Sequence, residues 1–475
     1  MERYLKYFGI VSVILFTTGI VSAFVILLRL SNLDDSYKYI WLWPLCFSFF
    51  VLICFRSKDQ IPECHLLGTA LIALALFTKT IVYPIYVLLA GHSYTGVRQV
   101  MLLESDIQKA TLITVFELVV VTVFIRIYQV HCKKKYRGKK TANLGLKMRG
   151  SKAVYVLYLL LAIVVYVYFG RSLNVIQFLV MSIPEEQGLI EMEPSIYDTL
   201  VKYIVSIGVA IMTLMCFDRN KQKYIQSGRK IRRYIYYSIL AAMFFTACII
   251  GESRSTQIAL GFVMCLILII DYPHSFKAII TGIGSVLIIV VMSITFIRTS
   301  GGGFFVDDSY AAKADKYQVY YGGPESIAQN IKVLEYKHLG LSQLAFDFVR
   351  STFPFNLFTK SLGNTTSQIY NLDIYSGNTT HGHVVFSSSY GYLFFGLLGI
   401  PLTMMLNVFL ILLFSRFFYF AKSYETKYLF GYCLMRLQAA CLVNTPTILG
   451  SVTQYIFTFG LLYFVALILN KNHYS

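Results

Sequence analysis

Charged side chains are scarce in this sequence. Asp, Glu, Lys and Arg make up 14% of its 475 residues, whereas apolar residues make up 56% and the mean hydropathy is +0.62. About a quarter of the residues of a typical soluble domain are charged, because its surface must be solvated. The composition therefore excludes the soluble classes and indicates a protein that crosses a membrane several times.

Alternating strands of about 10 residues, the pattern of a membrane β-barrel, are also absent. The apolar runs are instead about 17–25 residues long, the length at which a helix crosses about 30 Å of hydrocarbon. We therefore expect an all-α fold, a polytopic helical membrane protein with about twelve transmembrane helices, in a single integral membrane domain over residues 1–475. The expected helices are Phe8–Leu28, Tyr39–Phe55, His65–Ala90, Ala110–Val130, Ala153–Phe169, Leu200–Phe217, Tyr234–Ile250, Ile258–Ile270, Ala278–Ile297, Tyr390–Phe414, Tyr428–Val443 and Gly450–Leu469.

Acidic residues are fewer than basic ones: the sequence has 24 Asp and Glu but 42 Lys and Arg, which gives a formal net charge of +18. The excess lies in short connections between apolar runs, such as Lys133–Lys140 and Arg219–Arg233, the second with seven Lys or Arg. The positive-inside rule places these connections in the cytoplasm, and with about twelve spans both termini lie there too. Because the positive charge is confined to these connections, we expect no nucleic-acid partner.

Several chemical signatures are missing. The nine cysteines lie in or beside apolar runs, so the sequence indicates no disulfide framework and no thiolate metal site. Walker A, HExxH and nucleophile-elbow motifs are absent, which weighs against ATP-driven transport and the common hydrolases. We expect no cofactor and no bound metal.

One long, mostly polar interval, Arg298–Ser387, interrupts the apolar runs. It carries seven Lys or Arg and seven Asp or Glu, and the topology predicts it to be a large extracytoplasmic, periplasmic loop. Apolar residues recur at helical spacing after Pro324 and again after Leu341. We expect two short amphipathic helices there, lying on the membrane.

Three arginines, Arg254, Arg298 and Arg350, are predicted on the outer side, where basic residues are otherwise sparse. A planar guanidinium binds phosphate through two parallel hydrogen bonds, so these residues are candidates for holding a diphosphate without a metal. The alternative is that each arginine extends to a lipid phosphate as an ordinary membrane anchor.

Two histidines, His381 and His383, flank Gly382 near the end of the interval. An imidazole with an ordinary pKa of about 6.5 can accept a proton from a hydroxyl near neutral pH. The alternatives are two ordinary polar side chains, or a zinc site whose further ligands the sequence does not identify.

Three motifs resemble the Wzy-type O-antigen or oligosaccharide repeat-unit polymerases of bacterial surface polysaccharide. They are Gly251-Glu-Ser-Arg-Ser-Thr256 at an outer tip, Tyr321-Gly-Gly-Pro324 early in the loop, and Ser389-Tyr-Gly-Tyr-Leu-Phe-Phe-Gly-Leu-Leu-Gly399 at the loop exit. Many members have Asp-Phe-Gly before the exit helix, but this chain has Tyr390-Gly391, so that acidic role is unfilled. The resemblance implies catalytic roles for His381 or His383, diphosphate binding by Arg254, Arg298 and Arg350, and substrate contacts by Glu252, Tyr321, Asn378 and Tyr390.

The resemblance also implies a function in lipopolysaccharide biosynthesis. The growing glycan would be transferred from undecaprenyl diphosphate onto an incoming lipid-linked repeat unit, at the outer face of the bacterial cytoplasmic membrane. The implied partners are the undecaprenyl-diphosphate-linked oligosaccharide, membrane lipid and a chain-length regulator protein. Two alternatives remain: an O-antigen ligase, and a lipid-linked oligosaccharide flippase. A flippase would carry charged residues inside its spans and would not need the long loop, and the few charges inside these spans, chiefly Lys79, Glu117, Arg126 and Arg436, weigh against it.

Overall fold

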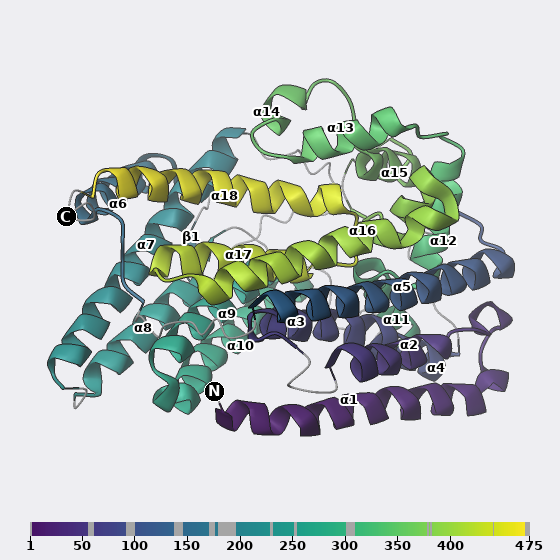
Figure 1. The fold of residues 1–475 in the computed structure, drawn as a ribbon. Helices are drawn as coiled ribbons and strands as arrows, with labels where there is room; N and C mark the ends of the chain where they lie inside the picture. Colours follow the sequence, from purple (N-terminus) through teal and green to yellow (C-terminus); the bar gives the residue numbers. More distant parts are fainter. Residues whose placement is uncertain are drawn as a thin grey trace. The chain divides into compact units, whose positions relative to one another are not determined.

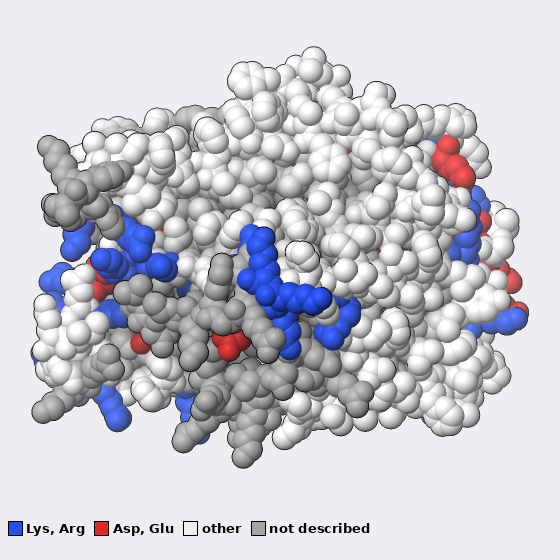
Figure 2. Space-filling model, in the orientation of Figure 1, with Lys and Arg blue, Asp and Glu red and all other residues white. Residues whose placement is uncertain are grey.

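The structure is a computed structural model, and it describes residues 2–55, 61–91, 100–136, 146–170, 176–178, 196–228, 231–250, 254–300, 309–377, 380, 382–439 and 441–470. These residues are nearly all helical (Figure 1). Large areas of the face in Figure 2 show no charged side chain. In the described part of the chain, nine helical segments are long and apolar enough to cross a membrane: Gly9–Leu28, Asp35–Phe55, Glu63–Ala90, Glu104–Lys135, Lys152–Phe169, Leu200–Gln226, Pro273–Val290, Ser387–Phe420 and Thr445–Ile468.

The chain is therefore a polytopic helical membrane protein, while the count of about twelve spans stays a prediction. The three further predicted spans correspond to helices α8 (Arg233–Ala247), α9 (Arg254–Asp271) and α17 (Tyr424–Ala439). Helix α8 has 15 residues, and α17 carries charged residues in both its first and last turns.

The prediction of a helix up to Ile250 is wrong at its end. The segment Cys248–Ile250 is strand β2, which pairs antiparallel with strand β1 (Ile176–Phe178). In the register, Ile176 lies opposite Ile250 and Phe178 opposite Cys248. Consecutive β-branched residues at the end of β2 favour the extended backbone once a partner strand is present.

The contacts divide the chain into two compact units. Unit 1 comprises residues 1–140, 307–416 and 437–451, and unit 2 comprises residues 141–306, 417–436 and 452–475. The single domain predicted over residues 1–475 stays a prediction. Each unit is described by itself below.

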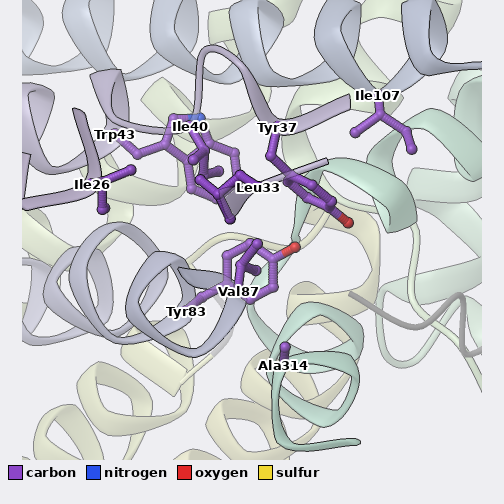
Figure 3. Close-up of a cluster of buried hydrophobic side chains, with 9 residues drawn as sticks. All are labelled: Ile26, Leu33, Tyr37, Ile40, Trp43, Tyr83, Val87, Ile107 and Ala314. Carbon is purple, nitrogen blue, oxygen red and sulfur yellow. The ribbon is translucent and has the colours of Figure 1, made fainter. Parts of the chain in front are cut away.

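Unit 1 contains the first five helices of the chain, the helices of the long polar interval and most of α16. One of its cores packs Trp43 and Tyr83 with their rings 5.9 Å apart, together with Tyr37 and Val87 (Figure 3). The buried Trp43 indole donates a hydrogen bond to the carbonyl of Thr111 at 3.2 Å. The helices of unit 1 are α1 (Glu2–Leu28), α2 (Leu42–Phe50), α3 (Leu66–Phe77), α4 (Tyr83–Ala90), α5 (Glu104–Tyr136), α11 (Tyr310–Tyr321), α12 (Pro324–Glu335), α13 (Leu341–Ser351), α14 (Asn356–Thr359), α15 (Thr366–Ile374) and α16 (Ser387–Phe420) up to Arg416.

Unit 2 is built on α6 (Lys152–Val165), α7 (Ile196–Gln226), α8, α9, α10 (Phe276–Ser300), most of α17 and the later part of α18 (Thr445–Ile468). A buried carboxylate organises the chain before α6. Glu425 accepts hydrogen bonds of 2.9 Å from the backbone N–H groups of Arg149 and Gly150 and from the hydroxyl of Tyr155. Three donors compensate much of the cost of burying this carboxylate.

The described residues of the long polar interval from Ser309 onward fold into helices of unit 1 rather than into an open loop. Helices α12 and α13 confirm the two helices predicted from the apolar spacing. The expectation that both lie on the membrane is wrong for α12, because residues on all its sides are buried, including the polar Glu325, Gln329 and Asn330. Helix α12 packs against α5 inside the unit, and Ile327 and Ile331 share a hydrophobic cluster with Ala110 and Ile113.

Helix α16 is broken near its start. Gly396 has φ 61° and ψ −148°, a combination that belongs to glycine. The break folds the first part of α16 back, so that a Cβ on Gly391 would lie 2.0 Å from the carbonyl oxygen of Gly399. Two glycines at this close approach allow a short helix, Ser387–Phe395, to pack against the longer part of α16.

Candidate functional site

The short helix Ser387–Phe395, here called the loop-exit helix, begins where the polar interval returns to an apolar span. Its first residue, Ser387, donates a hydrogen bond of 2.6 Å to Oε1 of Glu117 on α5. The other carboxylate oxygen of Glu117 lies 3.9 Å from the ammonium of Lys79, and both side chains are almost completely buried. This ion pair lies within two membrane-crossing segments of unit 1 and anchors the start of the loop-exit helix.

Further side chains of the loop-exit helix reach other elements. The hydroxyl of Ser389 donates to Oδ1 of Asn330 on α12 at 3.0 Å. The hydroxyl of Tyr390 donates to Oδ2 of Asp347 on α13 at 2.6 Å. On the next residue but one, the hydroxyl of Tyr392 accepts from the ammonium of Lys109 at 3.0 Å. The helix is thus held by α5, α12 and α13 at once.

Asp347 is the centre of the polar contacts around α13. Besides Tyr390, its carboxylate accepts from the side chain of Gln343 and from the backbone N–H of Thr366, both at 2.9 Å. Thr366 begins α15, whose N-terminus is closed by a capping box. Arg350 lies three residues after Asp347, so both project from neighbouring turns of one helix face. Asp347 therefore connects α13, α15 and the loop-exit helix.

The backbone of His383 is held by the side chain of Asn371 on α15. The amide oxygen of Asn371 accepts from the N–H of His383 at 2.7 Å, and its NH₂ group donates to the carbonyl of His383 at 2.9 Å. The imidazole is half-buried beside the ring of Tyr375, with 5.7 Å between the ring centroids. Burial lowers the pKa of His383 below its ordinary value, because desolvation disfavours the imidazolium. The ring is therefore neutral near pH 7 and able to accept a proton.

Residues 441–444, which follow α17, contact the residues just before the loop-exit helix. The side chain of Asn444 donates to the carbonyl of Val385 at 2.7 Å, and its backbone N–H donates to the same oxygen at 3.1 Å. Asn407 in turn donates to the carbonyls of Cys441 and Val443 at 3.1 and 2.7 Å. These amides, together with an isolated antiparallel bridge between Phe386 and Val443, hold residues 385–387 against residues 441–444.

The motif Tyr321-Gly-Gly-Pro324, near the start of the polar interval, contacts Phe386 at the start of the loop-exit helix. Tyr321 ends α11 and stacks on Tyr317 with 5.8 Å between ring centroids, and burial raises its pKa. The next residue, Gly322, has φ 74°, and a Cβ there would lie 2.8 Å from the ring of Phe386. Glycine is required at this turn for both its backbone and its contact with Phe386.

The structure thus links Tyr390 to α15 through Asp347, and α15 holds the backbone of His383. Arg350 lies on α13 one turn after Asp347, and Tyr321 precedes the turn at Gly322 that contacts Phe386. The other predicted site residues are not described to the same extent. Glu252, Asn378 and His381 lie outside the described residues, and Arg254 and Arg298 lie in helices α9 and α10 of unit 2, where their side chains are not described.

No protein-family model, curated protein or solved structure matches the chain. Its function therefore has to be argued from the site. In the described part of the chain, no group of three or more His, Cys, Asp or Glu is placed to hold a metal ion.

Sequence reasoning missed Asp347, Asn371, Asn330 and the pairing of Lys79 with Glu117. A signal existed for Asp347, because it interrupts the apolar spacing of α13 with a charge that becomes buried. Asn330 and Asn371 carried no comparable signal, since an amide in a polar interval is ordinarily exposed.

Proposed function

We propose that the chain is a membrane-embedded glycosyltransferase of the repeat-unit polymerase type. In this proposal it transfers a growing glycan from undecaprenyl diphosphate onto a lipid-linked repeat unit at the outer face of the bacterial cytoplasmic membrane. The observation that carries the proposal is His383, a neutral imidazole whose backbone is held by Asn371 beside the network of Asp347. The motifs quoted above supply the substrate class.

The proposed reaction needs a base and an anion holder. An acceptor hydroxyl attacks the anomeric carbon, the bond from that carbon to the diphosphate oxygen breaks, and the hydroxyl proton passes to a base. His383 has the protonation state for this task. The leaving diphosphate takes the bonding electron pair, and arginines are suited to stabilising its charge.

Arg350 is the predicted site arginine that lies in unit 1 with the loop-exit helix. It lies in the last turn of α13, three residues after the carboxylate that binds Tyr390. In this proposal it contributes to diphosphate binding, and the same role for Arg254 and Arg298 of unit 2 rests on the resemblance alone. The acidic position of the Asp-Phe-Gly motif is Ser389 in this chain, and we infer that Asp347, bonded to the next residue Tyr390, supplies a carboxylate there from another helix.

A flippase remains the second candidate, and the buried Lys79–Glu117 pair favours it. Ionisable groups inside membrane-spanning segments often mark a path for ions or polar substrates. In this chain, however, Glu117 also accepts the hydrogen bond from Ser387, which gives the pair a structural task at the loop-exit helix.

Deletion of the gene tests the proposal on one lipopolysaccharide gel. Without a polymerase, flipping and ligation continue, so lipid A core should carry a single repeat unit and no ladder. A ligase deletion should leave uncapped core with polymer on undecaprenyl diphosphate, and a flippase deletion should leave neither capped core nor outward-facing polymer.

For a product without a lipid A acceptor, the expected result is accumulation of single lipid-linked repeats. The matched control is the deletion strain that expresses the wild-type chain, which should recover the ladder. Long polymer that persists in the deletion strain would disprove the polymerase assignment.

A further inference from the structure

An exposed apolar surface runs along helices α13 and α14, which are drawn at the top of Figure 1. On α13, the side chains of Leu341, Ala345 and Val349 are exposed. They are four residues apart, so they lie along one face of the helix. Asp347 lies on the opposite face, where it is buried and accepts hydrogen bonds from neighbouring elements. Helix α13 thus turns a polar face to the protein and leaves an apolar face exposed.

The apolar surface continues onto α14, which packs against α13, and onto the turn that follows α14. Phe355, Phe358 and Leu362 are 57%, 76% and 71% exposed there. Their spacing of three and four residues places them on one side of this helical turn. A single exposed apolar residue is ordinary, whereas several large ones in one region mark contact with a partner or a membrane. We call these three residues, together with Leu341, Ala345 and Val349, the α13–α14 surface.

Charged groups lie beside the α13–α14 surface rather than in it. The segment that carries the surface contains three charged residues, Asp347, Arg350 and Lys360, and Asp347 is buried. Helix α15, which packs against α13, adds Asp373, whose carboxylate is paired with the ammonium of Lys337 at 3.0 Å. Both signs of charge are therefore present around the surface. Its occupant is selected by apolar contact and not by charge.

The last turn of α13 touches a membrane-crossing segment. A Cβ on Gly450 would lie 3.1 Å from the carbonyl oxygen of Ser351, the last residue of α13. Gly450 is the sixth residue of the segment Thr445–Ile468, so it lies about 8 Å along the helix from Thr445. The 24 residues of that segment make about 36 Å of helix, slightly more than the roughly 30 Å thickness of the hydrocarbon core. The end of α13 therefore lies near the boundary of that core.

A second contact attaches α13 to the start of another membrane-crossing segment, Ser387–Phe420. Tyr390, in the first turn of that segment, donates the hydrogen bond of 2.6 Å to Asp347. The two segments begin beside each other within unit 1, since the N–H of Ser387 donates to the carbonyl of Leu442 at 2.9 Å, just before α18. Helix α13 is therefore held where two spans begin, at the level of the lipid headgroups.

We propose that the α13–α14 surface is embedded in the membrane interface, with its apolar side chains at the boundary between lipid headgroups and acyl chains. A helix with one apolar face buries that face about 5–10 Å into this boundary, which matches the level of Gly450. The polar residues between Phe358 and Leu362 stay in contact with headgroups and water. The lipid contact fixes the depth of the helix that carries Asp347 and Arg350. It does not depend on the glycosyltransferase proposal.

The test places a fluorescent coumarin amino acid at Val349 or at Phe358 of the full-length protein, which is purified and reconstituted in phosphatidylcholine nanodiscs. Phospholipids with brominated acyl chains quench the label where it touches lipid, and iodide quenches it where it touches water. Two sets of lipid, with bromine close to the headgroup or near the end of the chain, report the depth of the label. An uncharged-label experiment in a zwitterionic lipid measures apolar contact without any contribution from net lipid charge.

Two further label positions are the controls. Tyr336 is exposed between the charged Glu335 and Lys337, so a label there should be quenched by iodide. Leu74 is exposed within the membrane-crossing segment Glu63–Ala90, so a label there should be quenched most by bromine near the end of the chain. Thermal unfolding verifies that each labelled protein is folded. Where a label prevents folding, the neighbouring surface position, Leu341 for Val349 or Leu362 for Phe358, takes its place.

At Val349 and Phe358 we expect a loss of about half or more of the fluorescence with bromine close to the headgroup, a smaller loss with deep bromine, and little quenching by iodide. Quenching by iodide to the extent seen at Tyr336 would place the surface in water and overturn the proposal. Protection from both quenchers would show that protein, such as a second copy of this chain, covers the surface, and would overturn it too. Lipid contact at only one of the two positions would refute the surface as defined.

Discussion

Tyr390 and Asp347 are 43 residues apart in the sequence and joined by a buried hydrogen bond of 2.6 Å. The bond ties the loop-exit helix to α13, and through the same carboxylate to the first residue of α15. It places a carboxylate next to the loop-exit motif Ser389–Gly399, whose own sequence contains no acidic residue. The arrangement gives the site its rigidity, because a buried carboxylate with three donors has few alternative positions.

Removing this bond should affect both stability and function. Tyr390→Phe keeps the ring packed against Phe394 but leaves one oxygen of Asp347 without its hydroxyl donor. We expect a loss of about 1–3 kcal/mol in the free energy of unfolding, and shorter polymer. Thermal unfolding and the lipopolysaccharide ladder measure the two effects. Tyr336→Phe, at an exposed tyrosine of the same interval, is the control and should change neither.

His383 should give the activity a dependence on pH. The neutral imidazole is the active form, and burial lowers its pKa below about 6.5. Activity of the purified protein should therefore be constant above that pH and fall as the pH drops through the lowered pKa. The free energy of unfolding should change with pH in the same direction, because the folded state favours the neutral ring. The contribution of His383 to stability is present above about pH 6.5 and is lost as the pH falls.

The control for this prediction is His383→Gln, which should be nearly inactive at every pH and lack this pH-dependent part of the stability. A chelator separates the base from the zinc alternative. Activity that is lost to EDTA and restored by added zinc would contradict a role for His383 as a base.

The rate of polymer formation should depend on the planar shape of the three arginine side chains as well as on their charge. Replacing Arg254, Arg298 or Arg350 by Ala should lower the rate about 10²–10³-fold, if each donates to the developing charge of the diphosphate. Lysine should recover little activity, because it lacks the planar pair of donors. The measurement is the polymer formed per amount of membrane protein, with Lys360→Ala as an exposed control. Normal polymer in all three Arg→Lys variants would rule out the diphosphate-binding role.

Removing one partner of the buried Lys79–Glu117 pair should destabilise the protein more than removing both. Glu117→Leu leaves the ammonium of Lys79 buried without a counter-charge, which should cost about 3–5 kcal/mol of stability. The double variant Lys79→Met/Glu117→Leu should recover most of that loss, and Ser387→Ala should cost less than the single charge removal. Unfolding in denaturant measures all four proteins. A double variant that is no more stable than Glu117→Leu would show that the two charges do not interact.

The side of the membrane on which the long interval lies can be determined with introduced cysteines. Ser309→Cys and Ser361→Cys, both at exposed positions of the interval, should react with an impermeant maleimide in intact spheroplasts. Gln226→Cys, exposed at the end of α7, should react only after the membrane is opened. The wild-type chain, with its nine cysteines, sets the background. The opposite labelling pattern would move the proposed site to the cytoplasm.

The sequence by itself determined the class of the protein and most of its helices. Apolar run length and the scarcity of charge are local properties, and they predict membrane-crossing helices without any knowledge of their packing. The same reasoning found α12 and α13 from apolar spacing inside the polar interval. It misjudged the end of α8, because pairing of Cys248–Ile250 with Ile176–Phe178 depends on a distant segment.

Only the tertiary structure decided which polar groups meet. Ser387 and Glu117 are 270 residues apart, and the hydrogen bond between them has no signature in either local sequence. The burial of α12 likewise depends on α5, since its Glu325, Gln329 and Asn330 read as a polar surface until packing encloses them. Periodicity reports which side of a helix is apolar, whereas the partners of a buried polar side chain are set by the three-dimensional packing that surrounds it.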